Sequence, residues 1–257
     1  MNKNVLKLIC ILSAAVLILC GCSWSSKEMP QVAKTEKVEL ILSAPIMHSG
    51  NLTSTDGSII AEYYAAYPQF QENCRTAKNI NSTFSILAEG AVVDMTSFFN
   101  HVKTQLGENW ESQSFSTPFH SIKMEYTLVP SLSEYVCFAS NYVITEDGTE
   151  KVYPRVNLFL SSTGWSLNYE TLFGENTSVA TEQLISQLKE WCKNNKVPTD
   201  ALSTLNSKSF NGIFGITNDT VFVCFDPYFF STQFSECIIV HFPLAPYKGL
   251  FIEQINK

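Results

Sequence analysis

The sequence is short of the patterns that mark common enzyme and metal sites. It contains no CxxC pair, no GxSxG nucleophile elbow and no glycine-rich phosphate loop. Any chain of this length contains some serine, histidine and aspartate, so their presence does not argue for a hydrolase. A zinc site needs clustered ligands, and no histidine here lies near a pair of cysteines. We therefore expect a protein that is not an enzyme and that uses no metal and no cofactor. Its histidines are scattered: His48, His101, His120 and His241.

Charged residues are also scarce. They make up 16% of the chain, and 17 basic residues stand against 24 acidic ones. Without Lys3 and Lys7, which belong to the N-terminal leader described next, 15 basic residues remain against 24 acidic ones, a net charge near −9. This balance disfavours nucleic acid and anionic lipid as ligands. It suits a cationic partner such as a lysozyme, although solubility alone also explains a mildly acidic surface.

Only one long hydrophobic run is present. Leu6 to Leu19 is apolar and follows two lysines. The run is too short for a comfortable membrane span and has the length of a signal-peptide core. An uncleaved N-terminal anchor is the alternative interpretation. In both cases we expect the rest of the chain to lie outside the cytoplasmic membrane of a bacterium.

The residues Leu19-Cys20-Gly21-Cys22 resemble the lipobox of bacterial lipoproteins. In a lipobox, small residues precede the cut and the cysteine thiol takes diacylglycerol. Cys22 fits this position, whereas lipidation of Cys20 would place Leu19 at the cut. We predict that residues 1–21 are a lipoprotein signal peptide, that Cys22 carries the lipid, and that the protein meets the membrane only through this lipid.

Residues 22–37 are polar, rich in lysine and without an apolar period. They are predicted to be a disordered tether between the lipid and the folded domain. Ser23 directly follows the lipidated cysteine. A Gram-negative cell is expected to sort such a lipoprotein to the outer membrane, and a Gram-positive cell to keep it on the outer face of its only membrane. The sequence does not distinguish these hosts.

The remaining part of the chain, roughly 235 residues, is long enough for one large or two small domains. Apolar residues at 45% and aromatic residues at 12% indicate a packed globule. This part has five cysteines, an odd number that does not indicate a disulfide framework. Cys224 and Cys237 lie almost symmetrically about one loop. They either form a single disulfide across two strands or remain buried free thiols.

Hydrophobic periodicity predicts an α+β fold with mostly antiparallel strands. Apolar residues at steps of three and four indicate one long helix from Ala77 to Leu106, with Gly107 as its stop. A second helix is expected over Val179–Lys193, and one or two shorter helices pack on a sheet face. We divide the fold into an N-terminal half, 38–162, and a C-terminal half, 163–257, that ends in a closing hairpin. Strands are expected at Val38–Met47, Ile59–Tyr67, Ile122–Val129, Tyr135–Ile144, Val152–Leu160, Val221–Phe225 and Cys237–Phe242, and a helix or irregular tail at Pro246–Gln254.

The loop between the last two expected strands, Asp226 to Glu236, is unusually aromatic. A loop of this composition either packs on the core or is presented to a partner, because aromatic side chains bury much area at low entropic cost. His241, in the strand that follows, is interpreted as a core or edge histidine rather than a catalyst. The candidate partner-binding residues are Tyr228, Phe229, Phe230 and Phe234.

Short motifs occur in a characteristic order along the chain: Tyr67-Pro68, Ile80-Asn81, Thr163-Gly164, Leu172-Phe173, and a closing pattern from Phe222 through Pro227-Tyr228 to Pro243. This order resembles the paired extracellular module of RsiV-type anti-sigma factors, which is also found in PdaC-type peptidoglycan deacetylases and in many surface lipoproteins. There are two departures. Many members carry a Gly-Gly-Ala-His loop that is absent here from Thr145–Arg155, and the closing loop lacks the usual Ala-Pro-Tyr and glycine.

The resemblance implies a non-enzymatic binding module at the cell surface. Because RsiV-type proteins bind lysozyme through this module, the implied partner is a cationic protein such as lysozyme, or else a cell-wall glycan. The clustered Asp and His that hold the metal of the associated deacetylase domains are missing here. Two alternatives stay open: an envelope hydrolase or accessory protein that acts on peptidoglycan, and a structural envelope lipoprotein.

Overall fold

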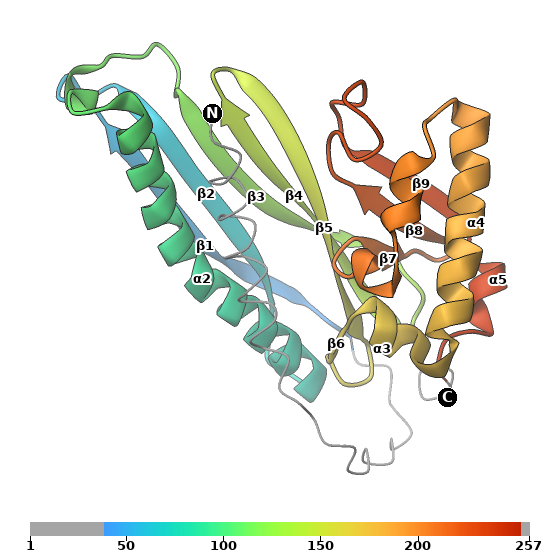
Figure 1. The fold of residues 1–257 in the computed structure, drawn as a ribbon. Coiled ribbons are helices and arrows are strands. Elements are labelled where there is room, and N and C mark those ends of the chain that lie inside the picture. Colours follow the sequence, from blue (N-terminus) through green and yellow to red (C-terminus); the bar gives the residue numbers. More distant parts are fainter. Residues whose placement is uncertain (1–38, 253–257) are drawn as a thin grey trace. The chain divides into compact units, whose positions relative to one another are not determined.

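The computed structural model describes residues 39–252, which all belong to the second of two units, Val38–Lys257. The predicted signal peptide, Cys22 and tether lie outside the described residues. The expected α+β fold is confirmed: a six-stranded sheet and a three-stranded sheet are accompanied by one long helix and several short ones (Figure 1). Among residues 39–252, no helix combines the length and apolar character needed to cross a membrane.

The large sheet has the strand order β1-β2-β3-β4-β5-β6. The expected antiparallel meander of β3, β4 and β5 is present, with Asp147-Gly148 at the turn between the last two. β2 and β3 instead run parallel, because the long helix between them carries the chain back along the sheet. The strands are β1 (Leu42–Thr53), β2 (Ile59–Phe70), β3 (His120–Val129), β4 (Tyr135–Glu146), β5 (Thr149–Leu160) and β6 (Ser166–Leu167).

The long helix α2 (Arg75–Leu106) covers one face of this sheet (Figure 1). Its apolar stripe is buried as the periodicity predicted, and the helix ends at Gly107, whose N–H donates to the carbonyl of Lys103. Phe84 lies at the centre of the packing, because its ring centroid is 5.1 Å from that of Phe138 in β4 and 5.6 Å from that of Phe159 in β5. Helix α2 and the strands β2, β3, β4 and β5 therefore share one core.

The C-terminal half adds a small antiparallel sheet with the order β7-β8-β9, packed against α3 and α4 (Figure 1). Residues of the large sheet, among them Cys137 and Leu158, belong to the same hydrophobic cluster as this small sheet. The N–H of Val156 also donates to the carbonyl of Gly212 at 2.7 Å. The elements are α3 (Tyr169–Phe173), α4 (Thr177–Asn195), β7 (Phe214–Ile216), β8 (Thr220–Phe225), β9 (Ile238–Pro243) and α5 (Ala245–Lys248), with 3-10 turns at Trp110–Ser112, Gly174–Asn176, Asp200–Thr204 and Ser207–Phe210.

Element ends differ from the expectation most clearly in β1, β2 and the C-terminal segment. β1 spans Leu42–Thr53 rather than Val38–Met47, and the helix or irregular tail expected at Pro246–Gln254 contains, within the described residues, the short helix α5 at Ala245–Lys248. β2 continues through Pro68 to Phe70, although proline was expected to end it at Tyr67. Proline removes a ladder donor, but β3 has already separated from β2 at this point, so no neighbouring strand needs that donor.

Candidate functional site

The large sheet splits between β2 and β3. The parallel pairing ends at Ala65 and Met124, and the last residues of β2 have no strand on that side. Asn81 of α2 fills the gap at Phe70: its Oδ1 accepts the Phe70 N–H at 2.8 Å, and its Nδ2 donates to the Phe70 carbonyl at 2.8 Å. A single buried amide thus supplies both hydrogen bonds that a neighbouring strand would otherwise make.

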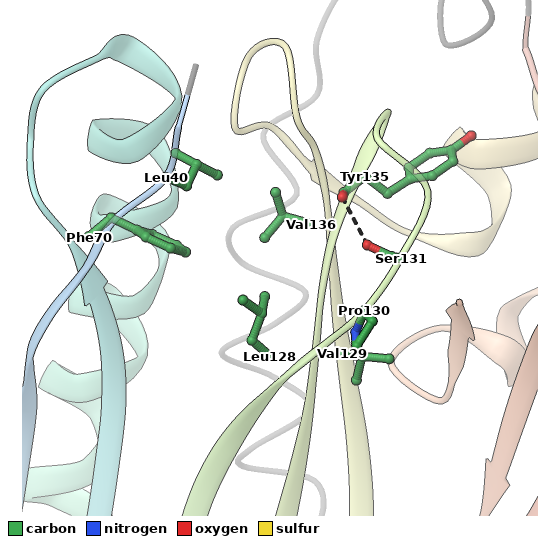
Figure 2. A pocket seen from close by; sticks show the side chains of 8 residues that line it. All are labelled: Leu40, Phe70, Leu128, Val129, Pro130, Ser131, Tyr135 and Val136. Atoms are coloured by element: carbon green, nitrogen blue, oxygen red, sulfur yellow. Dashed lines mark hydrogen bonds between the residues drawn. The ribbon is translucent and has the colours of Figure 1, made fainter. Parts of the chain in front are cut away.

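An apolar cavity of about 240 Å³ opens at this split (Figure 2). Its only polar side chain besides Tyr135 is Ser131, whose Oγ donates to the Tyr135 carbonyl at 2.9 Å. The Tyr135 hydroxyl points away from the cavity (Figure 2). The site therefore suits an apolar group rather than acid–base chemistry. The lining residues are Leu40, Phe70, Leu128, Val129, Pro130, Ser131, Tyr135 and Val136.

The aromatic loop between β8 and β9 is largely packed onto the fold. Phe230 is buried, and its ring centroid lies 5.0 Å from that of Phe225 and 5.9 Å from that of Trp191 in α4. Phe229 stacks on Phe225 at 4.6 Å. Phe229 and Phe234 are half-buried. These three phenylalanines hold the loop against the core and leave little of their surface for a partner.

Tyr228 is the exception, with 47% of its surface exposed. It has φ +64°, a left-handed backbone conformation that costs a residue with a side chain about 1–2 kcal/mol. The Tyr228 N–H donates to the Phe234 carbonyl at 2.6 Å across the loop. The structure thus fixes the backbone of Tyr228 and directs its side chain to solvent.

A salt bridge ties the same loop to the large sheet. Arg155 of β5 donates from Nη1 to Asp226 Oδ1 at 2.7 Å and from Nη2 to Oδ2 at 3.4 Å. Sequence reasoning missed this pair, because the two residues are 71 positions apart and neither has a distinctive neighbour. His241, in contrast, lies where it was interpreted to lie: it is exposed on the edge strand β9, with Nδ1 3.2 Å from Thr220 Oγ1.

Cys224 and Cys237 are both free thiols in the structure, as are the other three described cysteines. The β8–β9 register places Cys224 opposite Ile239, so Cys237 lies diagonally from it rather than across. Burial, aided by the nearby Cys237, raises the pKa of Cys224 to about 12. The disulfide between these residues stays a prediction.

Other ionisable groups of the described chain do not gather into a site. Within residues 39–252, no three histidines, cysteines or carboxylates lie close enough to hold a metal ion. His120 is buried with its Nε2 unpartnered in that part of the chain, and burial lowers its pKa. A neutral imidazole beside the Phe119 ring, at 4.3 Å between centroids, fits a core role.

The comparisons with known proteins support the fold. No family model matches the chain, and no curated protein matches it. A solved structure of a DUF3298 family member from Bacteroides fragilis aligns with a TM-score of 0.56 at 14% identity, covering 85% of this chain and 96% of that one. A DUF3298 family protein from Pseudomonas aeruginosa aligns with a TM-score of 0.52 at 11% identity, covering 85% and 97%. This chain therefore shares its fold with bacterial proteins of a domain family of unknown function.

Proposed function

We propose that this chain is a lipid-anchored, extracytoplasmic binding module without enzymatic activity. It recognises a cationic protein such as a lysozyme through the loop Asp226–Glu236, with Tyr228 at the centre of the contact. A cell-wall glycan is the alternative ligand. The lipobox-like residues around Cys22 and the order of motifs shared with RsiV-type and PdaC-type modules support the location and the class.

The observation that carries this proposal is the contrast between Tyr228 and Phe230. Phe230 is 5% exposed and holds the loop to α4, whereas Tyr228, two residues earlier, is 47% exposed. A backbone hydrogen bond and the Arg155–Asp226 salt bridge restrain the loop on either side. An aromatic residue held in place before binding loses little entropy in a complex, which is why such residues often dominate interfaces.

Charge supports a cationic partner. The loop contains no basic residue, and its two acidic residues are Asp226, which pairs with Arg155, and the exposed Glu236. The chain as a whole carries a formal charge of −7. Opposite charges accelerate encounter and favour one partner over others more than they raise affinity. Tyr228 would then supply affinity, and the acidic surface would supply selectivity.

The test is titration calorimetry of Val38–Lys257 with a C-type lysozyme at physiological salt. We expect saturable 1:1 binding that Tyr228→Ala weakens about tenfold or more. Val93→Ala is the matched control, because Val93 is 66% exposed on α2 and should leave the affinity within about twofold. Phe230→Ala is a poor probe, since the loss of a buried ring also unfolds the loop.

Two results separate the ligands. One result is a binding heat with soluble peptidoglycan fragments but none with lysozyme. If Tyr228→Ala also abolishes that heat, the ligand of the loop is a glycan. Binding that is equally weakened by Val93→Ala, or no heat with either ligand, would refute the proposal.

A further inference from the structure

Exposed apolar residues lie at the cavity, or beside one of its lining residues, at the split in the sheet. Leu128 lines the cavity and is 43% exposed, and Leu42, 51% exposed, pairs with the lining residue Phe70. Single exposed apolar side chains are ordinary, but exposed leucines grouped around an apolar cavity mark a contact surface. We define the apolar rim as Leu40, Leu42, Leu128 and Pro130.

The apolar rim lies where the described chain begins. Leu40 is the second described residue, and Cys22 lies 17 positions before Glu39. If the intervening residues form the tether that the sequence predicts, they span roughly 20–25 Å on average. If Cys22 carries a lipid, as the proposed function holds, the rim belongs to the part of the fold that is tied closest to the bilayer.

Two acidic residues close to the apolar rim indicate which kind of lipid surface the rim can contact. Glu39 directly precedes Leu40, and Glu134 precedes the lining residue Tyr135; both carboxylates are exposed. They would repel anionic headgroups, while the leucines gain free energy on entering hydrocarbon. The cavity is larger than the roughly 150 Å³ that holds benzene in an engineered apolar cavity. It therefore has room for the end of an acyl chain.

We propose that the apolar rim docks on the surface of a zwitterionic lipid bilayer, with an acyl chain end in the cavity. This contact adds to the lipid on Cys22 and fixes the orientation of the domain. Along β5, Arg155 lies five residues from Leu160, the partner of Tyr135. At the rise of a strand, this places the salt bridge of the binding loop roughly 16 Å from the cavity end. Docking would thus leave Tyr228 free to meet a soluble partner.

The experiment is flotation of Val38–Lys257 with phosphatidylcholine vesicles, in the absence of any attached lipid. This unit contains all the described cores, so it is expected to fold alone. We expect measurable partition that falls about tenfold in Leu128→Asp and further when Leu42→Asp is added. Val93→Asp, the same kind of change on α2, should partition within about twofold of the parent. Adding phosphatidylglycerol should reduce partition.

No flotation of the parent chain, or an equal loss in the Val93→Asp variant, would overturn the proposal. Flotation that increases with phosphatidylglycerol would overturn the assignment to a zwitterionic surface. Concentration-dependent dimerisation that Leu128→Asp abolishes would instead assign the rim to a second copy of the chain. Circular dichroism of each variant confirms that the fold is retained. Lipidation is scored separately by the mass of the full chain, so failure of the anchor and failure of the rim are distinguishable.

Discussion

The side chain of Asn81 takes the place of a β-strand next to Phe70. Its amide accepts the Phe70 N–H and donates to the Phe70 carbonyl, both at 2.8 Å, at the point where β3 has separated from β2. Two residues earlier, Pro68 has no N–H to satisfy, and its carbonyl accepts from Gln69 Nε2 at 2.9 Å. Proline and asparagine therefore stabilise together the split that forms the apolar cavity.

Replacing Asn81 by alanine should destabilise the fold by about 2–3 kcal/mol, because it leaves a buried N–H and a buried carbonyl without partners. The measurement is urea denaturation of the purified chain. Asn100→Ala, the same substitution on the exposed side of α2, should change the free energy of unfolding by less than about 0.5 kcal/mol. Equal effects in the two variants would show that the Asn81 amide has no special role.

Gly164 makes a close contact that only glycine permits. A Cβ at this position would lie 2.3 Å from the Thr76 carbonyl oxygen in the first turn of α2, and the residue has φ +72°. Gly164→Ala should therefore cost at least about 2 kcal/mol more than Gly148→Ala, measured by thermal unfolding. Gly148 is the matched control, since its φ is +73° and nothing lies within 4 Å of its added Cβ. A difference below about 0.5 kcal/mol would contradict the contact.

The salt bridge between Arg155 and Asp226 should matter more for the loop than for global stability. Its side chains are 45% and 43% exposed, and exposed pairs contribute less than about 1 kcal/mol. A double-mutant cycle with Arg155→Met and Asp226→Asn should give a coupling energy of about 0.5 kcal/mol that decreases at 1 M salt. The more exposed Lys123–Glu125 pair is the reference and should give less. A coupling above about 2 kcal/mol would show that the pair is a main support of the fold.

Burial of Cys137 predicts a loss of stability at alkaline pH. Burial raises the pKa of the Cys137 thiol to about 11, above the value near 9.0 of an exposed thiol. The unfolded chain releases this proton first, so the contribution is fully present below about pH 9 and is lost as pH rises through 11. The shift corresponds to roughly 2–3 kcal/mol.

Urea denaturation at pH 7.5, 9 and 10.5 measures this effect. The free energy of unfolding of the parent should fall over this range more steeply than that of Cys137→Ala. Parallel profiles of the two proteins would show that the Cys137 thiol is not the group responsible.

Much of the fold follows from local pattern. The apolar stripe of α2, the strands of the β3–β5 meander and the hairpin of β8 and β9 were predicted because each depends on residues close together in the sequence. The parallel pairing of β2 with β3 was not predicted. Neither strand alone encodes its neighbour, because the whole of α2 lies between them in the sequence.

In the candidate site, too, local sequence pattern does not predict which side chains are buried and which are exposed. Tyr228 and Phe230 are both aromatic residues of one loop, and nothing local distinguishes the exposed one from the buried one. Trp191, from a helix far away in the sequence, covers Phe230. The left-handed backbone at Tyr228 depends in turn on its bond to Phe234.

The most direct test of a binding role for this loop is photo-crosslinking from a benzophenone amino acid placed at position 228. With a C-type lysozyme present, we expect one covalent adduct with the mass of a 1:1 complex, and none when the same probe replaces Val93 on α2. Competition by unlabelled parent protein should remove the adduct, whereas competition by the Tyr228→Ala variant should remove much less. Equal crosslinking from both positions, or none from 228 under conditions where calorimetry detects binding, would contradict the assignment of the interface to the loop Asp226–Glu236.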